Sequence, residues 1–181
     1  MERNLSFIAL FAALIAALGL IPKIDMAFGV PITAQSLGVM LCGTILGARR
    51  GFLAVALFLF LVALGLPLLA GGRGGLGVFV SPTAGYLVGF LLSALVVGFI
   101  VERLPSHHLT LGVSLAAIVG GIGVMHICGI VGMAITLNKS IGEATMLALP
   151  FIPGDFVKAI VAGFITSTLV KARPEAVLSR A

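Results

Sequence analysis

Charged residues are scarce in this sequence. Only 9% of its 181 residues are Asp, Glu, Lys or Arg, whereas 60% are hydrophobic and the mean hydropathy is +1.27. Soluble domains carry about 25% charged residues, and no polar stretch here exceeds about a dozen residues. The sequence also lacks the Gly-x-x-x-x-Gly-Lys-Ser/Thr motif of nucleotide-hydrolysing domains. We therefore expect an integral membrane protein whose energy comes from a gradient or from a partner protein.

Cysteine is almost absent, because Cys42 and Cys128 are the two in the chain and both lie in apolar runs. Neither belongs to a Cys-x-x-Cys pair, so each is expected to be a small, buried side chain. His107 and His108 are adjacent in a polar turn with no third ligand nearby, and a metal site there is not expected. We predict neither a metal nor a cofactor.

Apolar runs separated by short polar turns fill the whole sequence. The first run resembles a secretory signal, but the hydropathy continues beyond it and no clear cleavage site follows, so we interpret it as a transmembrane helix. The pattern predicts an all-α integral membrane protein, a six-helix bundle that forms one transmembrane domain over residues 1–181. The predicted helices cover about residues 5–21, 33–48, 51–69, 82–102, 109–136 and 153–171.

Basic residues raise the net charge to +5, but they are scattered among the turns, which indicates topology signals and not a nucleic-acid surface. An even number of helices places both termini on one side of the membrane. Seven basic residues fall on that side and three on the other, so the termini are predicted to be cytoplasmic. The seven are Arg3, Arg49, Arg50, Arg103, Lys171, Arg173 and Arg180; the three are Lys23, Arg73 and Lys139.

Alanines form two stripes on the first predicted helix. Ala9 and Ala13 lie on one stripe, and Ala12 and Ala16 lie beside it. Small residues four positions apart let another helix approach closely. Either stripe could pack inside the bundle or against a partner protein, and the sequence does not choose between them.

Two charged residues, Asp155 and Lys158, stand in the otherwise apolar last run. Three positions apart on a helix, they lie about 60° apart in projection, so one ligand could meet both. Ionisable groups inside membrane segments are costly and usually mark a site. With a helix starting near Pro153, both would lie near one mouth of the bilayer. The alternative is an internal ion pair that fixes helix packing.

Three loops rich in glycine and proline, around Pro31, Gly74 and Pro153, are predicted on the outer side. Residues 71–77 include five glycines and cannot form a stable helix in an apolar phase. This loop is predicted to be a lid or a pocket wall if it enters the membrane, and a flexible connector if it does not. Polar residues gather on the same side and predict a pocket open to the outside. They are Gln35, Arg73, Tyr86, Asp155 and Lys158.

Two of these assignments have alternatives. Tyr86 could instead be an interfacial anchor. An intramembrane enzyme would use Asp155 as an acid or base, but the sequence offers no second intramembrane carboxylate and no Gly-x-Ser-x-Gly motif.

His126 lies near the middle of the fifth run, where a lone histidine is expected to be a hydrogen-bonded structural residue. A structural subunit without a ligand is a third class of function.

Three segments resemble the BioY family, the biotin-specific substrate-binding (S) components of energy-coupling factor (ECF) transporters. They are ITAQSLGVMLCG (32–43), PLLAGGRGGLGVFVSPTAGYLVGF (67–90) and PFIPGDFVKA (150–159). The resemblance implies a six-helix bundle in a prokaryotic cell membrane that binds biotin at its outer face. It also implies a transmembrane coupling subunit, docked on one of the alanine stripes, and two ATPase subunits. A biotin transporter acting without this energising module, or an S component for another vitamin, is the alternative.

The resemblance also implies roles for individual residues. Asp155 would accept hydrogen bonds from the ureido N–H groups of biotin. Lys158 would neutralise the valerate carboxylate, or else hold Asp155 ionised while Arg73 meets that carboxylate. Tyr86 would cover the thiophane ring. Gln35 and the loop around Gly74 would complete and close the pocket.

Overall fold

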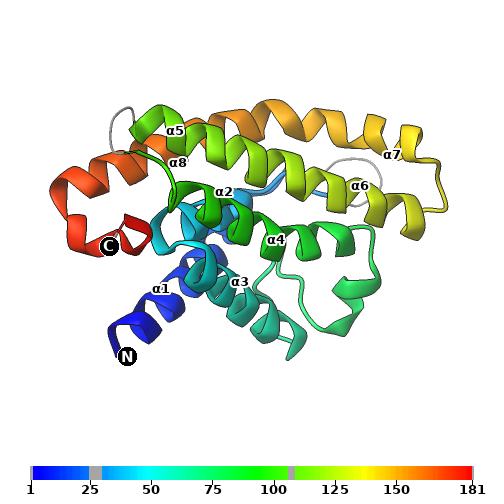
Figure 1. Ribbon diagram of the computed structural model, residues 1–181. Helices are drawn as coiled ribbons and strands as arrows, with labels where there is room; N and C mark the ends of the chain where they lie inside the picture. Colours follow the sequence, from blue (N-terminus) through cyan, green and yellow to red (C-terminus); the bar gives the residue numbers. More distant parts are fainter. Residues whose placement is uncertain (1, 25–29, 106–108, 181) are drawn as a thin grey trace.

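The computed structural model describes residues 2–24, 30–105 and 109–180. His107 and His108, where no metal site was expected, lie outside these ranges. Within them the chain is all-helical, apart from two isolated bridges that pair Ile24 with Ile32 and Leu69 with Arg73. The α-helices, labelled in Figure 1, are α1 (Glu2–Leu18), α2 (Gln35–Leu41), α3 (Ala48–Ala63), α4 (Ala84–Val101), α5 (Leu109–Ala117), α6 (Met125–Thr136), α7 (Ile141–Ala148) and α8 (Ile152–Ala172).

Short helical segments of other kinds extend or join these helices. A π-helical segment, Cys42–Leu46, continues α2, and a second, Ile118–Val124, joins α5 to α6 in one uninterrupted helix. A 3₁₀ turn, Leu149–Phe151, joins α7 to α8. Further 3₁₀ turns cover Leu76–Val80, Pro174–Ala176 and Leu178–Arg180. All six predicted apolar runs are therefore helical, with differences mainly at their ends.

Helix α8 begins at Ile152, close to the predicted start of the last helix at Pro153, but it is preceded by a helix that was not predicted, α7. Ser140 caps its start: the Glu143 backbone N–H donates to the Ser140 hydroxyl at 3.3 Å, and the Ser140 N–H donates to the Glu143 carboxylate at 2.9 Å. This capping box satisfies two donors that a helix start leaves without partners. Pro153 then lies in the first turn of α8, where its missing N–H costs little.

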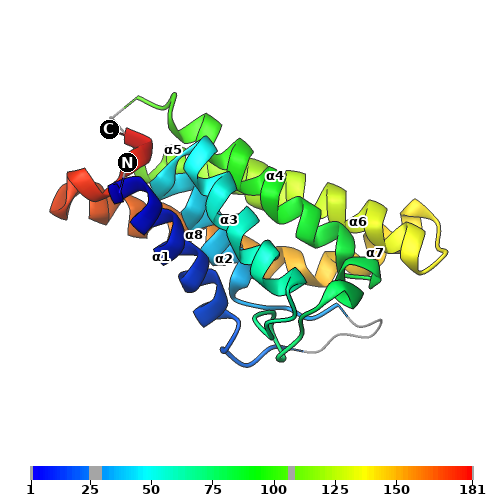
Figure 2. The same ribbon diagram turned by 90° about the horizontal axis from the view of Figure 1, so that it is seen from below.

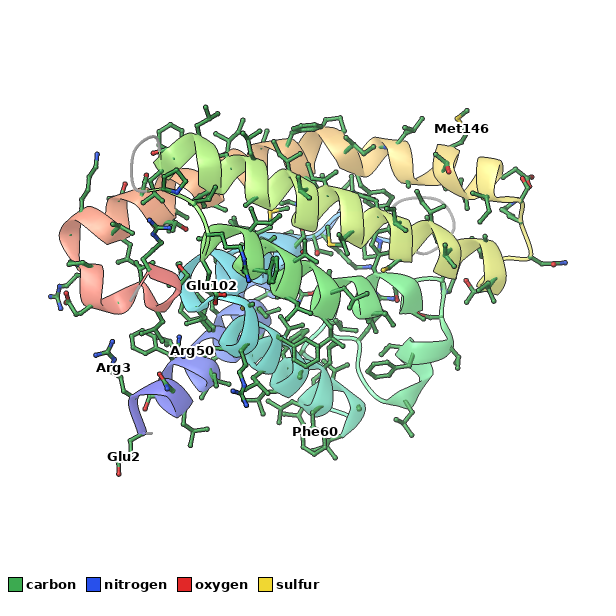
Figure 3. All side chains as sticks on the ribbon, viewed as in Figure 1. Glu2, Arg3, Arg50, Phe60, Glu102 and Met146 are labelled. Atoms are coloured by element: carbon green, nitrogen blue, oxygen red, sulfur yellow. The ribbon has the colours of Figure 1, made fainter. Side chains whose placement is uncertain are left out.

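Length and composition allow three of the described helices to cross a membrane: Ala84–Val101, Leu109–Thr136 and Ile141–Ala172. The apolar helix Gln35–Leu46 is shorter. Large apolar side chains point outward around the molecule. Figure 3 shows two of them, Phe60 and Met146, which are 59% and 68% exposed. Such a surface suits contact with lipid, in agreement with the predicted all-α membrane protein.

Helix α4 lies at the centre of the bundle and is packed by α3 on one side and by α6 on the other (Figures 1 and 2). Its approach to α6 depends on glycine. A Cβ atom on Gly85 would lie 2.8 Å from the Gly132 Cα, closer than side chains tolerate. A Cβ on Gly89 would lie 2.9 Å from the Met125 carbonyl oxygen. These glycines let α4 and α6 pack backbone against backbone.

The segment after α8 folds back against the bundle, and both chain ends lie at the same end of the molecule (Figure 1). Val177, Leu178 and Ser179 are buried. Five hydrogen bonds tie this segment to other parts of the chain: Arg3 Nη2 to Glu175 O (2.9 Å), Arg50 Nη1 to Leu178 O (3.3 Å), Ser179 Oγ to Thr44 O (2.6 Å), Arg180 Nη1 to Val101 O (3.0 Å) and Arg180 Nη1 to Leu104 O. Arg50 therefore does more than signal orientation, because it holds the C-terminal segment in place.

The cysteines match their prediction in part. Cys42 is fully buried, Cys128 is half-buried, and neither forms a disulfide bond. No group of three or more His, Cys, Asp or Glu side chains suitable for a metal ion occurs among the described residues.

Candidate functional site

A cavity of about 550 Å³, counting its open mouth, lies where the first turns of α2, α4 and α8 meet the start of α6 and the loop after α3. Small-molecule sites are typically concave and mostly apolar, with a few polar groups that fix the ligand. Much of the wall is apolar and includes Leu69, Leu87, Phe90, Met125 and Phe151. The polar side chains in the wall are Thr33, Gln35, Ser36, Arg73, Thr83, Tyr86, His126, Asp155 and Lys158.

Asp155 is the centre of the polar part of this cavity, and it is only 4% exposed. Its Oδ1 accepts hydrogen bonds from Ser36 Oγ at 3.1 Å and from Lys158 Nζ at 2.8 Å. Its Oδ2 lies 2.9 Å from His126 Nε2. Burying a carboxylate is costly unless it is paired and hydrogen-bonded. Groups from α2, α6 and α8 together provide that compensation.

The Lys158 ammonium group has an acceptor for each of its three hydrogens. It donates to the Thr33 carbonyl oxygen at 2.7 Å, to Ser36 Oγ at 2.9 Å and to Asp155 Oδ1 at 2.8 Å. The predicted placement of Asp155 and Lys158 on one helix face is confirmed. The ion pair that we weighed as an alternative to a ligand site is also present, so the ion pair and the cavity coexist.

His126 links Asp155 to Tyr86. Its Nδ1 lies 3.2 Å from the Tyr86 hydroxyl, and the two rings meet edge to face with centroids 5.6 Å apart. Phe151 packs against both rings, with centroids at 6.1 and 6.3 Å. Gly129 of α6 leaves the space that the Tyr86 ring fills, because a Cβ atom there would overlap that ring. Tyr86 is thus buried in the bundle, and the alternative of an exposed interfacial anchor is wrong.

Gln35 lines the cavity, but its amide group is used by the protein backbone. Its Nε2 donates to the Ile15 and Leu68 carbonyl oxygens at 3.1 and 3.0 Å, and its Oε1 accepts from the Ala70 N–H at 3.0 Å. Both amide hydrogens therefore have partners. Gln35 connects α1 and α2 to the loop after α3, and so holds the cavity wall together.

The glycine-rich loop follows two buried residues, Leu69 and Ala70, which are 4% and 1% exposed, whereas Gly71 and Gly72 are themselves exposed. Leu69 and Arg73 exchange backbone hydrogen bonds of 3.0 and 3.2 Å around a tight turn. Gly71 and Gly72 have φ of 80° and 70°, a conformation that favours glycine. Leu69 and Arg73 line the cavity, so this loop is a pocket wall and not a mere connector.

Gly74, which the sequence pattern assigned to the ligand site, does not line the cavity. It lies against the Leu66 carbonyl oxygen, where a Cβ atom would overlap that oxygen. Its absent side chain therefore lets the loop fold onto the end of α3. This placement corrects the prediction.

Four polar residues of the cavity wall were not assigned to the site from the sequence: Thr33, Ser36, Thr83 and His126. His126 was expected to be a hydrogen-bonded structural residue, and the hydrogen bonds exist, but they are to Tyr86 and Asp155 in the cavity wall. A lone histidine in an apolar run gives no indication of its partner on another helix. Ser36 and Thr33 flank Gln35 in the segment TAQS, and this cluster of polar residues at the start of an apolar run was the available signal.

Comparisons with known proteins agree with this arrangement. The BioY family model matches residues 2–175. A relative from Rhodobacter capsulatus, described as biotin transporter BioY, is 52% identical over 99% of this chain and 100% of its own length. Another of the same description, from Rhizobium etli, is 49% identical over 95% of each chain.

A solved structure, described as the S-component for biotin from an ECF-type ABC transporter, superposes with a TM-score of 0.88. It is 31% identical in sequence, and the match covers 94% of this chain and 92% of that one. The family model, the relatives and the shared fold lead to one conclusion: the chain belongs to the BioY family.

Proposed function

We propose that the cavity at the ends of α2, α4 and α8 binds biotin and that Asp155 recognises its ureido group. As a member of the BioY family, the chain is a biotin-uptake protein of the substrate-binding type and not an enzyme. The buried carboxylate of Asp155 in the wall of a small-molecule cavity is the observation that supports this site most strongly.

The ureido ring presents two N–H donors and one carbonyl acceptor and carries no charge. An ionised carboxylate only accepts hydrogen bonds and has about four acceptor positions. Three donors already reach Asp155, so one position is left for a ureido N–H. A second ureido N–H would take the place of the Ser36 hydroxyl on Oδ1, and the Ser36 Oγ would still accept from Lys158 Nζ at 2.9 Å.

The carboxylate end of biotin has two candidate partners, Lys158 and Arg73. Lys158 already donates to three acceptors, and meeting a second carboxylate would break at least one of these bonds. This arrangement favours the reading in which Lys158 holds Asp155 ionised. Arg73, on the glycine-rich loop, then meets the valerate carboxylate, for which its planar guanidinium group is well suited.

An equilibrium binding titration of the purified protein tests the site. We expect tight binding of biotin and none of thiamine or riboflavin, which would exclude an S component for another vitamin. Asp155→Asn should weaken biotin binding by about tenfold or more, because it replaces one acceptor oxygen by an NH₂ donor, and a ureido donor left without an acceptor costs about 1–3 kcal/mol. Glu175→Gln removes an exposed carboxylate and is the matched control. Equal affinity in the two variants would overturn the role of Asp155.

We further propose six membrane crossings with both termini in the cytoplasm and the cavity open to the outside. The shared position of the chain ends and the excess of basic residues at that end support this topology. Helices α1 and α3, with 17 and 16 residues, are at the short limit for a crossing. Labelling of single introduced cysteines from either side of intact cells would test the orientation.

The exposed alanine stripe of α1 is proposed as the docking face for a transmembrane coupling subunit that works with two ATPase subunits. Ala9 and Ala13 are exposed, whereas Ala12 is 3% exposed and Ala16 is half-buried. This difference in exposure supports the Ala9–Ala13 register and leaves Ala12 and Ala16 to internal packing. Transport without such a module is the alternative, and uptake by cells that lack it would favour that alternative.

A further inference from the structure

We propose that His126 is a positioning residue for biotin recognition. In its Nε2–H tautomer it holds the Asp155 carboxylate in the orientation that receives the ureido group, and Tyr86 selects that tautomer. This inference rests on the proposed function of Asp155 as the ureido acceptor. It adds a residue of α6, and a hydrogen-bonded chain of three side chains, to the recognition of the ligand.

The tautomer follows from the partners of the ring. An ionised Asp155 can only accept, so the imidazole nitrogen 2.9 Å from its Oδ2 must carry a hydrogen. In the neutral ring the other nitrogen, Nδ1, is then an acceptor. The hydroxyl of Tyr86 lies 3.2 Å from Nδ1 and can donate to it. A phenol in this place stabilises the Nε2–H form over the Nδ1–H form.

The orientation of Asp155 depends on this contact. Lys158 and Ser36 both reach Oδ1, and His126 is the partner of Oδ2 among the described hydrogen bonds. With Oδ1 alone held, the carboxylate plane can turn about its Cβ–Cγ bond. The second contact fixes that plane, and a fixed plane fixes the acceptor directions that a rigid ureido ring must match.

The surroundings of His126 keep the ring in place. Its side chain is 7% exposed, and the ring packs between Tyr86 and Phe151. The backbone approach of α4 to α6 brings Tyr86 to it, and Gly129 leaves space for the Tyr86 ring. A ring held by packing on its faces and by hydrogen bonds at both nitrogens is preorganised for its role.

Replacement of His126 by two amides separates positioning from packing. A glutamine amide nitrogen reaches the place of the imidazole Nε2, whereas an asparagine amide reaches only the place of Nδ1. We expect His126→Gln to bind biotin within about threefold of the unmodified protein. His126→Asn and His126→Leu should bind about tenfold more weakly or worse, because a donor to a buried charged group is lost. Thermal unfolding without ligand shows that each variant is folded.

A similar loss of affinity in His126→Gln and His126→Asn, both folded, would overturn the positioning role and leave His126 as a packing residue. If His126→Leu does not fold, the comparison of His126→Gln with His126→Asn still distinguishes a positioning role from a packing role. Absence of biotin binding by the unmodified protein would instead overturn the proposed function. The two failures are therefore distinguishable.

The role of Tyr86 is tested in two backgrounds. Tyr86→Phe removes the hydroxyl that selects the tautomer, so it should weaken biotin binding in the unmodified protein. Glutamine has no tautomers, so Tyr86→Phe should have no further effect when combined with His126→Gln. An equal loss in both backgrounds would overturn the action of Tyr86 through His126 and indicate direct contact between its hydroxyl and the ligand.

Discussion

The His126 Nε2 and the Asp155 Oδ2 lie 2.9 Å apart, although the two residues are 29 positions apart in the chain and belong to different long helices. This contact joins the two halves of the cavity wall, one formed by α4 and α6 and the other by α2 and α8. The side chains of the proposed ligand site are therefore held by tertiary packing as much as by their own helices.

Arg73 and Lys158 should respond differently when the ligand loses its charge. Arg73→Ala is expected to weaken biotin by about tenfold or more, since hydrogen bonds to charged groups contribute about 1.5–3 kcal/mol. It should leave the affinity for biotin methyl ester nearly unchanged. Lys158→Met should weaken both ligands alike, because it disturbs Asp155. Calorimetric titration of both ligands measures this, and the reverse pattern would assign the carboxylate to Lys158.

A bulky residue on the exposed stripe of α1 should affect transport and not binding. Ala13→Trp is expected to leave biotin affinity in detergent unchanged and to reduce biotin uptake by cells that contain the coupling module. Ala12→Trp, on the buried stripe, is the matched comparison, and it should lower stability by about 1–3 kcal/mol or more through overpacking. Unchanged uptake by Ala13→Trp would exclude this stripe as the docking face.

Gly129→Ala should damage the site through Tyr86. The added Cβ overlaps the Tyr86 ring, so that ring must move away from His126. We expect weaker biotin binding and a stability loss of about 1–3 kcal/mol. Gly123→Ala on the same long helix meets only the Ile118 carbonyl oxygen at 3.9 Å and should be tolerated. Biotin titration and thermal unfolding should be measured for both variants. Equal affinity and equal stability of the two variants would contradict the inference that Gly129 leaves the space for the Tyr86 ring.

The C-terminal segment should contribute to stability and not to affinity. Ser179→Ala removes a hydrogen bond to Thr44 and leaves a buried carbonyl oxygen without that donor, at a cost of about 1–3 kcal/mol. Biotin affinity should stay within about twofold, because the cavity lies at the other ends of α2, α4 and α8. Arg173→Ala changes an exposed residue next to the same segment and serves as control. A lower affinity of folded Ser179→Ala would show that the two ends are coupled.

Local sequence patterns predicted the parts of the site that depend on spacing within one element. The helical period placed Asp155 and Lys158 on one face, and the glycine content of residues 71–77 predicted that the segment around Arg73 is not a stable helix. The six apolar runs are all helical. Each of these predictions needed only a periodicity or a propensity, which a single sequence contains.

Features that depend on two elements were not predicted. The partners of His126 follow from the close approach of α4 to α6, which depends on Gly85 and Gly132 together. Gly74 was assigned to the ligand site from the resemblance to the BioY family, but it lies against the Leu66 carbonyl oxygen and outside the cavity wall. Helix α7 was not predicted either, although the residues of its Ser140–Glu143 capping box are visible in the sequence.

The π-helical segment Ile118–Val124 rotates the side chains of α6 about the helix axis relative to those of α5, within one continuous helix. A π turn takes up an additional residue, and one residue corresponds to about 100° of rotation in an α-helix. The face that α6 presents is therefore turned relative to the face that α5 presents to α8. In a regular α-helix of the same sequence, packing α5 against α8 would direct His126 away from Asp155. The proposed role of His126 thus depends on the length of this segment as well as on the side chains that surround the cavity.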